Sequence, residues 1–131
     1  MKRFTFLIIL CVVVAKRRIP EVQVKQWERI ISSFKADCIE EANVDPILVE
    51  RMVYELEFPE DEGLKKYWRC THNHFHSIKA NHNLDGEQIS NQVPFVPPQL
   101  ALQCTTESNH IKDLIEKAFE GAKCIINKLA V

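Results

Sequence analysis

The 131-residue sequence has only three glycines and six prolines, too few for a collagen-like chain, a low-complexity segment or a turn-dense all-β protein. It also has no excess of basic charge, because 17 Lys and Arg face 18 Asp and Glu. We therefore expect no nucleic-acid partner. With 46% hydrophobic and 27% charged residues, the composition favours a single folded domain rather than disorder.

Common enzyme and metal motifs are absent as well. The chain contains no H-E-x-x-H, no G-x-S-x-G and no phosphate-binding glycine loop, so we predict neither catalysis nor a cofactor. Zinc proteins usually draw cysteines from close pairs such as C-x-x-C, which this chain lacks. His72 and His76 would share one helical face, but no nearby cysteine or carboxylate completes a site. A solvated histidine surface is preferred, and a small metal-binding protein is kept as an alternative.

The first fifteen residues, MKRFTFLIILCVVVA, have the pattern of a secretory signal peptide. Lys2 and Arg3 form a positive start, and an apolar run follows from Phe4 to Val14. That run is too short for a membrane span, which needs about 20 apolar residues. We predict a secreted protein without stable membrane insertion, whose mature domain comprises residues 16–131.

Hydrophobic residues in the mature domain recur with the period of an α-helix, and no strand-like alternation is present. The clearest stripe consists of Ile111, Leu114, Ile115, Ala118, Phe119, Ala122, Ile125, Ile126 and Leu129, with polar residues, Lys117 among them, on the opposite side. A second continuous stripe follows Pro20 and consists of Val24, Trp27, Ile30, Ile31, Phe34, Cys38 and Ala42.

Start and stop signals divide the remaining chain. Asp45-Pro46 predicts a helix start, and Phe58-Pro59 predicts its end. Another helix is expected from about Asp61 into the histidine-rich stretch, and Asp85–Gln88 has the form of a capping box. The three prolines of Val93–Pro98 must interrupt any helix. A short helix should follow with Leu100, Leu102 and Cys104.

Four cysteines remain after residue 15, namely Cys38, Cys70, Cys104 and Cys124. An even number in a short secreted chain predicts two disulfides, and spacing alone permits three pairings. At about 100° per residue, Cys38 lies within its apolar stripe, whereas Cys124 lies on the polar side of the last helix. The partner of Cys124 must lie on a segment that crosses this outer face. The segment just before the last helix, which carries Cys104, is the nearest candidate. This favours the pair Cys104–Cys124 and leaves Cys38–Cys70 as the second pair.

Several stretches of the chain resemble insect odorant-binding proteins, the helical carriers of pheromones and odorants. The most specific is GLKKYWRC at 63–70, which is similar to the third helix of that family around its cysteine. Asn83–Gly86, Phe58–Asp61 and Asp113–Phe119 followed by Cys124 are further matches. The resemblance covers nearly the whole mature chain and implies an all-α fold, a compact bundle of about six helices around a hydrophobic cavity with two disulfides.

The cysteine pattern departs from that of six-cysteine family members. Those proteins carry a mutually paired cysteine at each of the positions occupied here by Lys66 and Ile115. The chain therefore resembles the four-cysteine "Minus-C" type, and the resemblance implies the same pairing that the helix angles favour. Because only packing around Ile115 would hold the third and last helices together, we predict a more adaptable pocket than in six-cysteine members.

The resemblance implies a secreted carrier that reversibly binds small hydrophobic ligands, such as odorants, pheromones or other semiochemicals and lipids. An empty cavity costs roughly 24 cal/mol per Å3, so a cavity retained in a small protein indicates an apolar occupant. Tyr67 or His72 is expected to orient the ligand. The alternative is a secreted defence or signalling protein with a filled core. The expected ligand-binding residues are Trp27, Ile31, Phe34, Met52, Leu56, Trp68, His72, Phe75, Leu102, Ala118 and Ile125.

A second hypothesis concerns pH. His72, His74, His76 and His82 lie close together in the sequence, and imidazoles gain charge between about pH 5 and 8. Their mutual repulsion would loosen an adjacent pocket wall. The resemblance points the same way, since some family members release their ligand on acidification.

Overall fold

The computed structural model describes residues 16–131, so the predicted signal peptide lies outside the described residues. In this part of the chain the structure is all-helical, as predicted, with seven helices rather than about six. One isolated β-bridge joins Ile78 to Leu84. The helices are α1 (Glu21–Ile31), α2 (Lys35–Ala42), α3 (Pro46–Glu55), α4 (Glu62–His74), α5 (Gly86–Gln92), α6 (Pro98–Ser108) and α7 (Leu114–Leu129).

The extra helix arises within the stripe that follows Pro20. α1 ends at Ile31, a turn covers residues 32–34, and α2 begins at Lys35. The Ser32 hydroxyl donates to the Arg29 carbonyl at 2.8 Å, the kind of local side-chain bond that competes with helix continuation. Phe34 stays buried across the turn. The helical period therefore predicted the buried face correctly but did not reveal the break.

Aspartates cap four of the helices, and the sequence predicted the starts at Asp45, Asp61 and Asp85 but not the one at Asp113. Their side chains accept main-chain N–H groups at the starts of α3, α4, α5 and α7, and each such cap contributes about 1 kcal/mol. The second half of the predicted capping box is wrong, because the Gln88 amide donates to the Phe75 carbonyl at 3.0 Å and does not reach back to Asp85. α7 begins at Leu114, so Ile111 precedes the helix.

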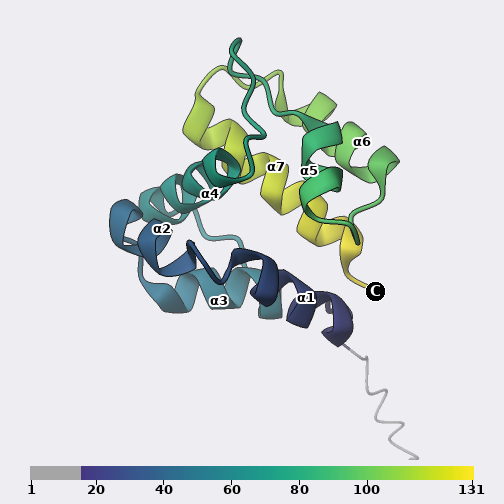
Figure 1. Ribbon diagram of the computed structural model, residues 1–131. Helices are drawn as coiled ribbons and strands as arrows, with labels where there is room; N and C mark the ends of the chain where they lie inside the picture. The colour runs from purple at the N-terminus through teal and green to yellow at the C-terminus, as the bar shows by residue number, and fades with distance from the viewer. Residues whose placement is uncertain (1–15) are drawn as a thin grey trace, which may run out of the picture.

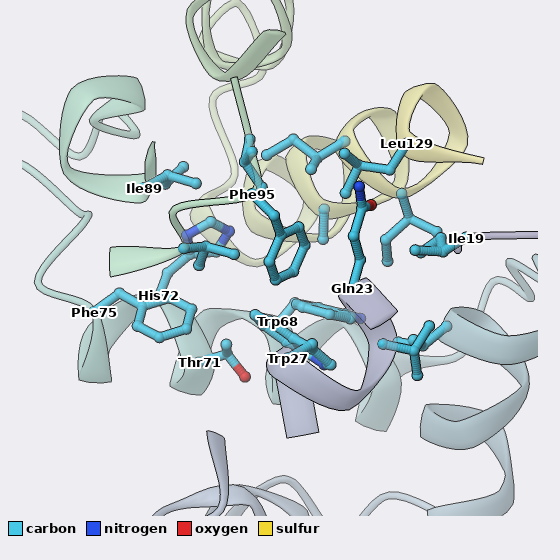
Figure 2. Close-up of a pocket in the computed structure, with 17 residues that line it drawn as sticks. Ile19, Gln23, Trp27, Trp68, Thr71, His72, Phe75, Ile89, Phe95 and Leu129 are labelled. Atoms are coloured by element: carbon cyan, nitrogen blue, oxygen red, sulfur yellow. The ribbon is translucent and has the colours of Figure 1, made fainter. Parts of the chain in front are cut away.

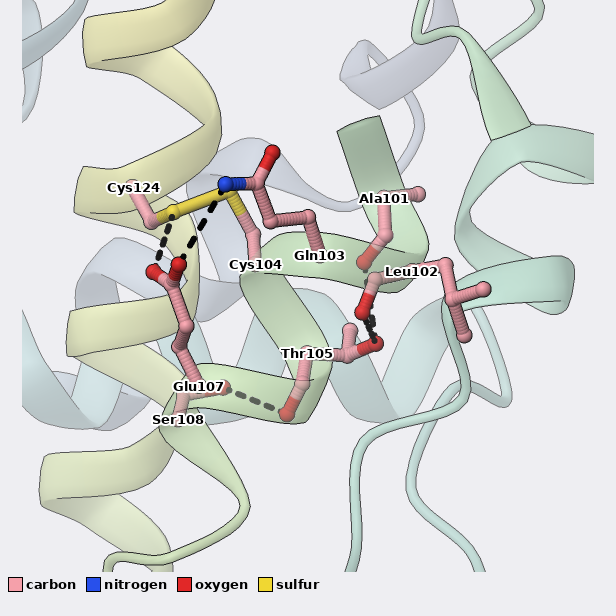
Figure 3. Close-up of a disulfide and its surroundings, with 8 residues drawn as sticks. All are labelled: Ala101, Leu102, Gln103, Cys104, Thr105, Glu107, Ser108 and Cys124. Carbon is pink, nitrogen blue, oxygen red and sulfur yellow. Dashed lines mark hydrogen bonds between the residues drawn. A yellow bond between two sulfur atoms is a disulfide. The ribbon is translucent and has the colours of Figure 1, made fainter. Parts of the chain in front are cut away.

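Helix α4 packs between α2 and α7, while α5 pairs with α6 and α6 packs on α7 (Figure 1). The structure contains both expected disulfides. Cys38–Cys70 joins α2 to α4, and Cys104–Cys124 joins α6 to α7 (Figure 3). At Gly86 a Cβ atom would lie 3.0 Å from the Ala101 carbonyl oxygen, so glycine permits the close approach of α5 and α6.

The two ends of the described chain meet beside α7. The Arg18 N–H donates to the Val131 carbonyl at 3.2 Å, and the Val131 N–H donates to the Arg18 carbonyl at 3.0 Å. The Arg17 guanidinium also donates to the Asn127 carbonyl at 2.6 Å. These bonds bring Ile19 against the end of α7. None of the described helices has the length and apolar character needed to cross a bilayer.

Candidate ligand-binding site

An apolar cavity of about 60 Å3, partly open at its edge, lies between α1, α4, α5 and α7 (Figure 2). Its volume is below the roughly 150 Å3 of an apolar cavity that holds benzene. A larger ligand would therefore require lining side chains to move. The cavity is lined by Ile19, Gln23, Val24, Trp27, Val53, Trp68, Thr71, His72, Phe75, Ile89, Val93, Phe95, Val96, Ala122, Ile125, Ile126 and Leu129.

One wall of the cavity is aromatic. The rings of Trp27 and Trp68 stack with centroids 5.9 Å apart, and Phe75 meets Trp27 edge-on at 5.8 Å. Such pairs contribute about 0.5–1.5 kcal/mol each beyond their buried area. The Trp68 indole N–H donates to the Met52 sulfur at 2.9 Å. Because that donor is occupied, Trp68 offers the cavity an apolar surface.

His72 is the buried ionisable side chain of this wall, with 4% of its surface exposed. Its Nδ1 lies 2.8 Å from the Ser77 hydroxyl oxygen, and its Nε2 has no hydrogen-bond partner. Burial lowers the pKa of His72 to about 4, and the Ala118 main chain, the second and smaller cause, acts in the opposite direction. The imidazole is consequently neutral at pH 7.

The other expected polar group, Tyr67, is fully buried but does not line the cavity. Burial raises the pKa of Tyr67 to about 12, so the phenol stays protonated. Its hydroxyl lacks a hydrogen-bond partner. Of the two side chains expected to orient a ligand, only His72 lines the cavity.

The histidines do not form the helical chelating pair considered from the sequence. α4 ends at His74, and His76 follows the helix with a positive φ of 54°. His72 and His76 therefore do not share a helical face. His74 is exposed and stacks on Phe34 with ring centroids 4.4 Å apart.

Two groups of possible metal ligands lie close together in the described part of the chain. In one, the sulfurs of Cys38 and Cys70 are bonded to each other beside His74, and a disulfide sulfur is not a thiolate ligand. The other is the trio Glu60, Glu116 and Glu120. The ammonium group of Lys65 occupies this trio, 2.6 Å from a carboxylate oxygen of both Glu60 and Glu116.

The structure brings together five of the eleven residues expected to bind ligand. Trp27, Trp68, His72, Phe75 and Ile125 line the cavity, and their contact with a ligand stays a prediction. Ile31, Phe34, Met52 and Ala118 are packed in the core outside it, and half-buried Leu56 caps α3. Placing Leu102 in the pocket was wrong, because it is 62% exposed on the outer side of α6.

The most informative lining residues missed from the sequence come from the proline-rich loop between α5 and α6. Val93, Phe95 and Val96 point into the cavity from this irregular segment (Figure 2 labels Phe95). A search for helical periodicity cannot identify these residues, because they do not lie in a helix. Their signal was the presence of three large apolar side chains among prolines, since exposed loops are usually polar. The other missed residues are Ile19, Gln23, Val24, Val53, Thr71, Ile89, Ala122, Ile126 and Leu129.

Comparison with known proteins gives a single finding at the level of families. The model of the PBP/GOBP family matches residues 21–128, from the first residue of α1 almost to the end of α7. No curated protein and no solved structure matches the chain. The match covers most of the chain, including every helix around the cavity. The protein therefore belongs to the PBP/GOBP family, the insect pheromone- and odorant-binding proteins.

Proposed function

We propose that this protein is a secreted carrier that reversibly encloses small hydrophobic ligands, such as odorants, pheromones or other semiochemicals and lipids. The observation that carries the proposal is the apolar cavity between α1, α4, α5 and α7. Family membership supports it, because this is a family of binding proteins rather than enzymes. The two disulfides fit an oxidising extracellular environment.

Binding would be driven by removal of apolar ligand surface from water, at about 25 cal/mol per Å2. The resting cavity is small, so enclosure of most ligands must involve some expansion. Phe95 is suited to this movement because it projects from an irregular loop and is only half-buried.

The proposal is tested by displacement of the fluorescent probe N-phenylnaphthylamine and by native mass spectrometry of protein from its source tissue. A carrier should bind the probe saturably, and a small organic molecule should copurify with it. Ala122→Phe would fill the cavity from α7 and should weaken probe binding by about tenfold or more. Ala36→Phe, on the exposed side of α2, is the matched control and should leave binding unchanged.

The alternative of a defence or signalling protein with a filled core predicts a different result. In that case the wild-type protein would show no saturable probe binding, and Ala122→Phe would change only stability. Circular dichroism of each variant separates lost binding from lost folding.

A further inference from the structure

Two side chains of the cavity wall carry buried polar atoms whose hydrogen-bonding capacity is unused. In the described part of the chain, the buried side-chain nitrogen and oxygen atoms without a partner are Gln23 Oε1, Tyr67 Oη and His72 Nε2. Gln23 and His72 both line the cavity, and Figure 2 shows their side chains on its wall. An unsatisfied buried polar group costs about 1–3 kcal/mol, so its persistence calls for a physical explanation.

Two other polar groups of the same wall already have hydrogen-bond partners. The Thr71 hydroxyl donates to the Tyr67 carbonyl at 3.1 Å. The Trp68 indole N–H donates to the Met52 sulfur. His72 and Gln23 are therefore the side chains of the described cavity wall that carry a buried, unpaired polar atom, and a ligand reaches these atoms only when lining side chains move.

The hydrogen bonds around Ser77 indicate which nitrogen of His72 carries the proton. The Ser77 hydroxyl lies 3.2 Å from the His72 carbonyl oxygen and 2.8 Å from Nδ1, and it has one hydrogen to donate. Both contacts are hydrogen bonds if the hydroxyl donates to the carbonyl and accepts from Nδ1–H. This network assigns the proton to Nδ1 and leaves a lone pair on Nε2.

The unpaired Oε1 atom of Gln23 is also a hydrogen-bond acceptor, because it is an amide oxygen. We propose that the cavity selects hydrophobic alcohols, whose hydroxyl group donates a hydrogen bond to Nε2 of His72 while the hydrocarbon chain lies against the Trp27 and Phe75 rings. This inference rests on the proposed carrier function and specifies its ligand class. Aldehydes, ketones, ethers and esters offer only acceptors, so they leave Nε2 unpaired.

The expected selectivity follows from the value of one hydrogen bond. A net contribution of about 0.5–1.5 kcal/mol corresponds to about a threefold to tenfold difference in dissociation constant. The preference should therefore be clear between ligands of equal size, although hydrophobic burial supplies most of the affinity.

The inference is tested with n-octanol, heptyl methyl ether and n-nonane, which have equal chain length and differ in hydrogen-bonding character. Their dissociation constants are measured by displacement of N-phenylnaphthylamine from the wild-type protein. The alcohol should bind about threefold to tenfold more tightly than the ether. Equal or tighter binding of the ether would overturn the alcohol preference and leave the carrier function intact. Failure of all three ligands to displace a bound probe or to bind directly in calorimetry would overturn both.

Two variants then test whether Nε2 of His72 causes the preference for alcohols. His72→Phe keeps an aromatic ring without the acceptor and should remove the preference for alcohol while retaining binding of n-nonane. Ser77→Ala removes the group that holds the proton on Nδ1, and it should shift the preference toward the ether. If either variant fails to fold, nitrogen-15 NMR of wild-type His72 gives the answer directly. A protonated Nε2 in that spectrum would contradict the assignment, and an unprotonated Nε2 would support it.

Discussion

Helix α4 is held in two different ways on its two sides. Toward α2 it is bonded covalently through Cys38 and Cys70, whose side chains are 0% and 5% exposed. Toward α7 the polar connection is the ion pair of Lys65 with Glu116, and the Lys65 ammonium also lies 5.7 Å from the centre of the Phe119 ring. Our expectation that packing alone would hold the third and last helices together was therefore wrong.

The difference matters because the cavity lies along the second junction. Trp68, Thr71 and His72 line it from α4, and Ala122 and Ile125 line it from α7. A disulfide permits little change in the separation of the helices that it joins. An ion pair and apolar contacts can rearrange at lower cost. We therefore expect the α2–α4 junction to preserve the fold and the α4–α7 junction to adapt to a ligand.

Removing the covalent junction should produce the largest effect. Cys38→Ala together with Cys70→Ala should lower the free energy of unfolding by about 3–4 kcal/mol, because the unfolded chain regains the entropy of an open loop. Guanidinium unfolding measures this change. The Cys104→Ala and Cys124→Ala pair provides the control, and its effect should be slightly smaller because its sequence separation is 20 rather than 32 residues. A loss below about 1 kcal/mol would contradict the assigned role of the first disulfide.

Acidification should destabilise the folded protein through His72, on the cavity side of α4. Because burial lowers the pKa of His72 to about 4, the unfolded chain binds this proton more readily than the folded protein. The free energy of unfolding should therefore fall as the pH decreases from about 6.5 to about 4, with a total contribution of roughly 3 kcal/mol. Urea unfolding across this interval measures the change.

His72→Gln should remove that contribution from the pH profile, whereas His110→Gln, at an exposed position, should preserve it. Superimposable profiles of wild type and His72→Gln would rule out His72 as the source. Ligand affinity measured over the same interval tests the pH-release hypothesis separately.

The ion pair across α4 and α7 should have the smallest effect on global stability. The hydrogen bonds that the Lys65 ammonium donates to Glu116 and, as the smaller cause, to Glu60 raise the pKa of Lys65, so the lysine is charged throughout the neutral range. Lys65→Met should leave the fold intact and accelerate amide hydrogen exchange in α4 and α7 more than in α2. Mass spectrometry of proteolytic peptides measures the exchange. The neighbouring exposed Lys66→Met is the control, and equal acceleration by both variants would count against a specific role for the pair.

Features of the fold that depend on neighbours in the sequence were predictable. Asp45, Asp61 and Asp85 were recognised as helix starts because a cap requires only a side chain and the main-chain N–H groups two or three residues later. The Cys104–Cys124 bond could be favoured because Cys124 lies on the side of α7 opposite its apolar stripe. Both inferences use the geometry of a single helix.

Other features depended on neighbours far away in the chain. Lys117 was expected on the polar side of the last helix, but it is buried and donates to the His82 carbonyl at 2.9 Å. Leu102 is as apolar as Ile125, yet Leu102 is exposed and Ile125 is buried. A helical period identifies one face of one helix and does not say which segment will lie against it.

The sequence by itself determined that this chain forms capped amphipathic helices linked by two disulfides, because those properties arise from local hydrogen bonding, side-chain period and cysteine position. The tertiary structure alone decided where the cavity lies, that Phe95 enters it from a loop, and that His72 has an unpaired nitrogen. The physical reason is that a cavity and an unsatisfied buried atom exist only where several distant segments meet without filling the space between them.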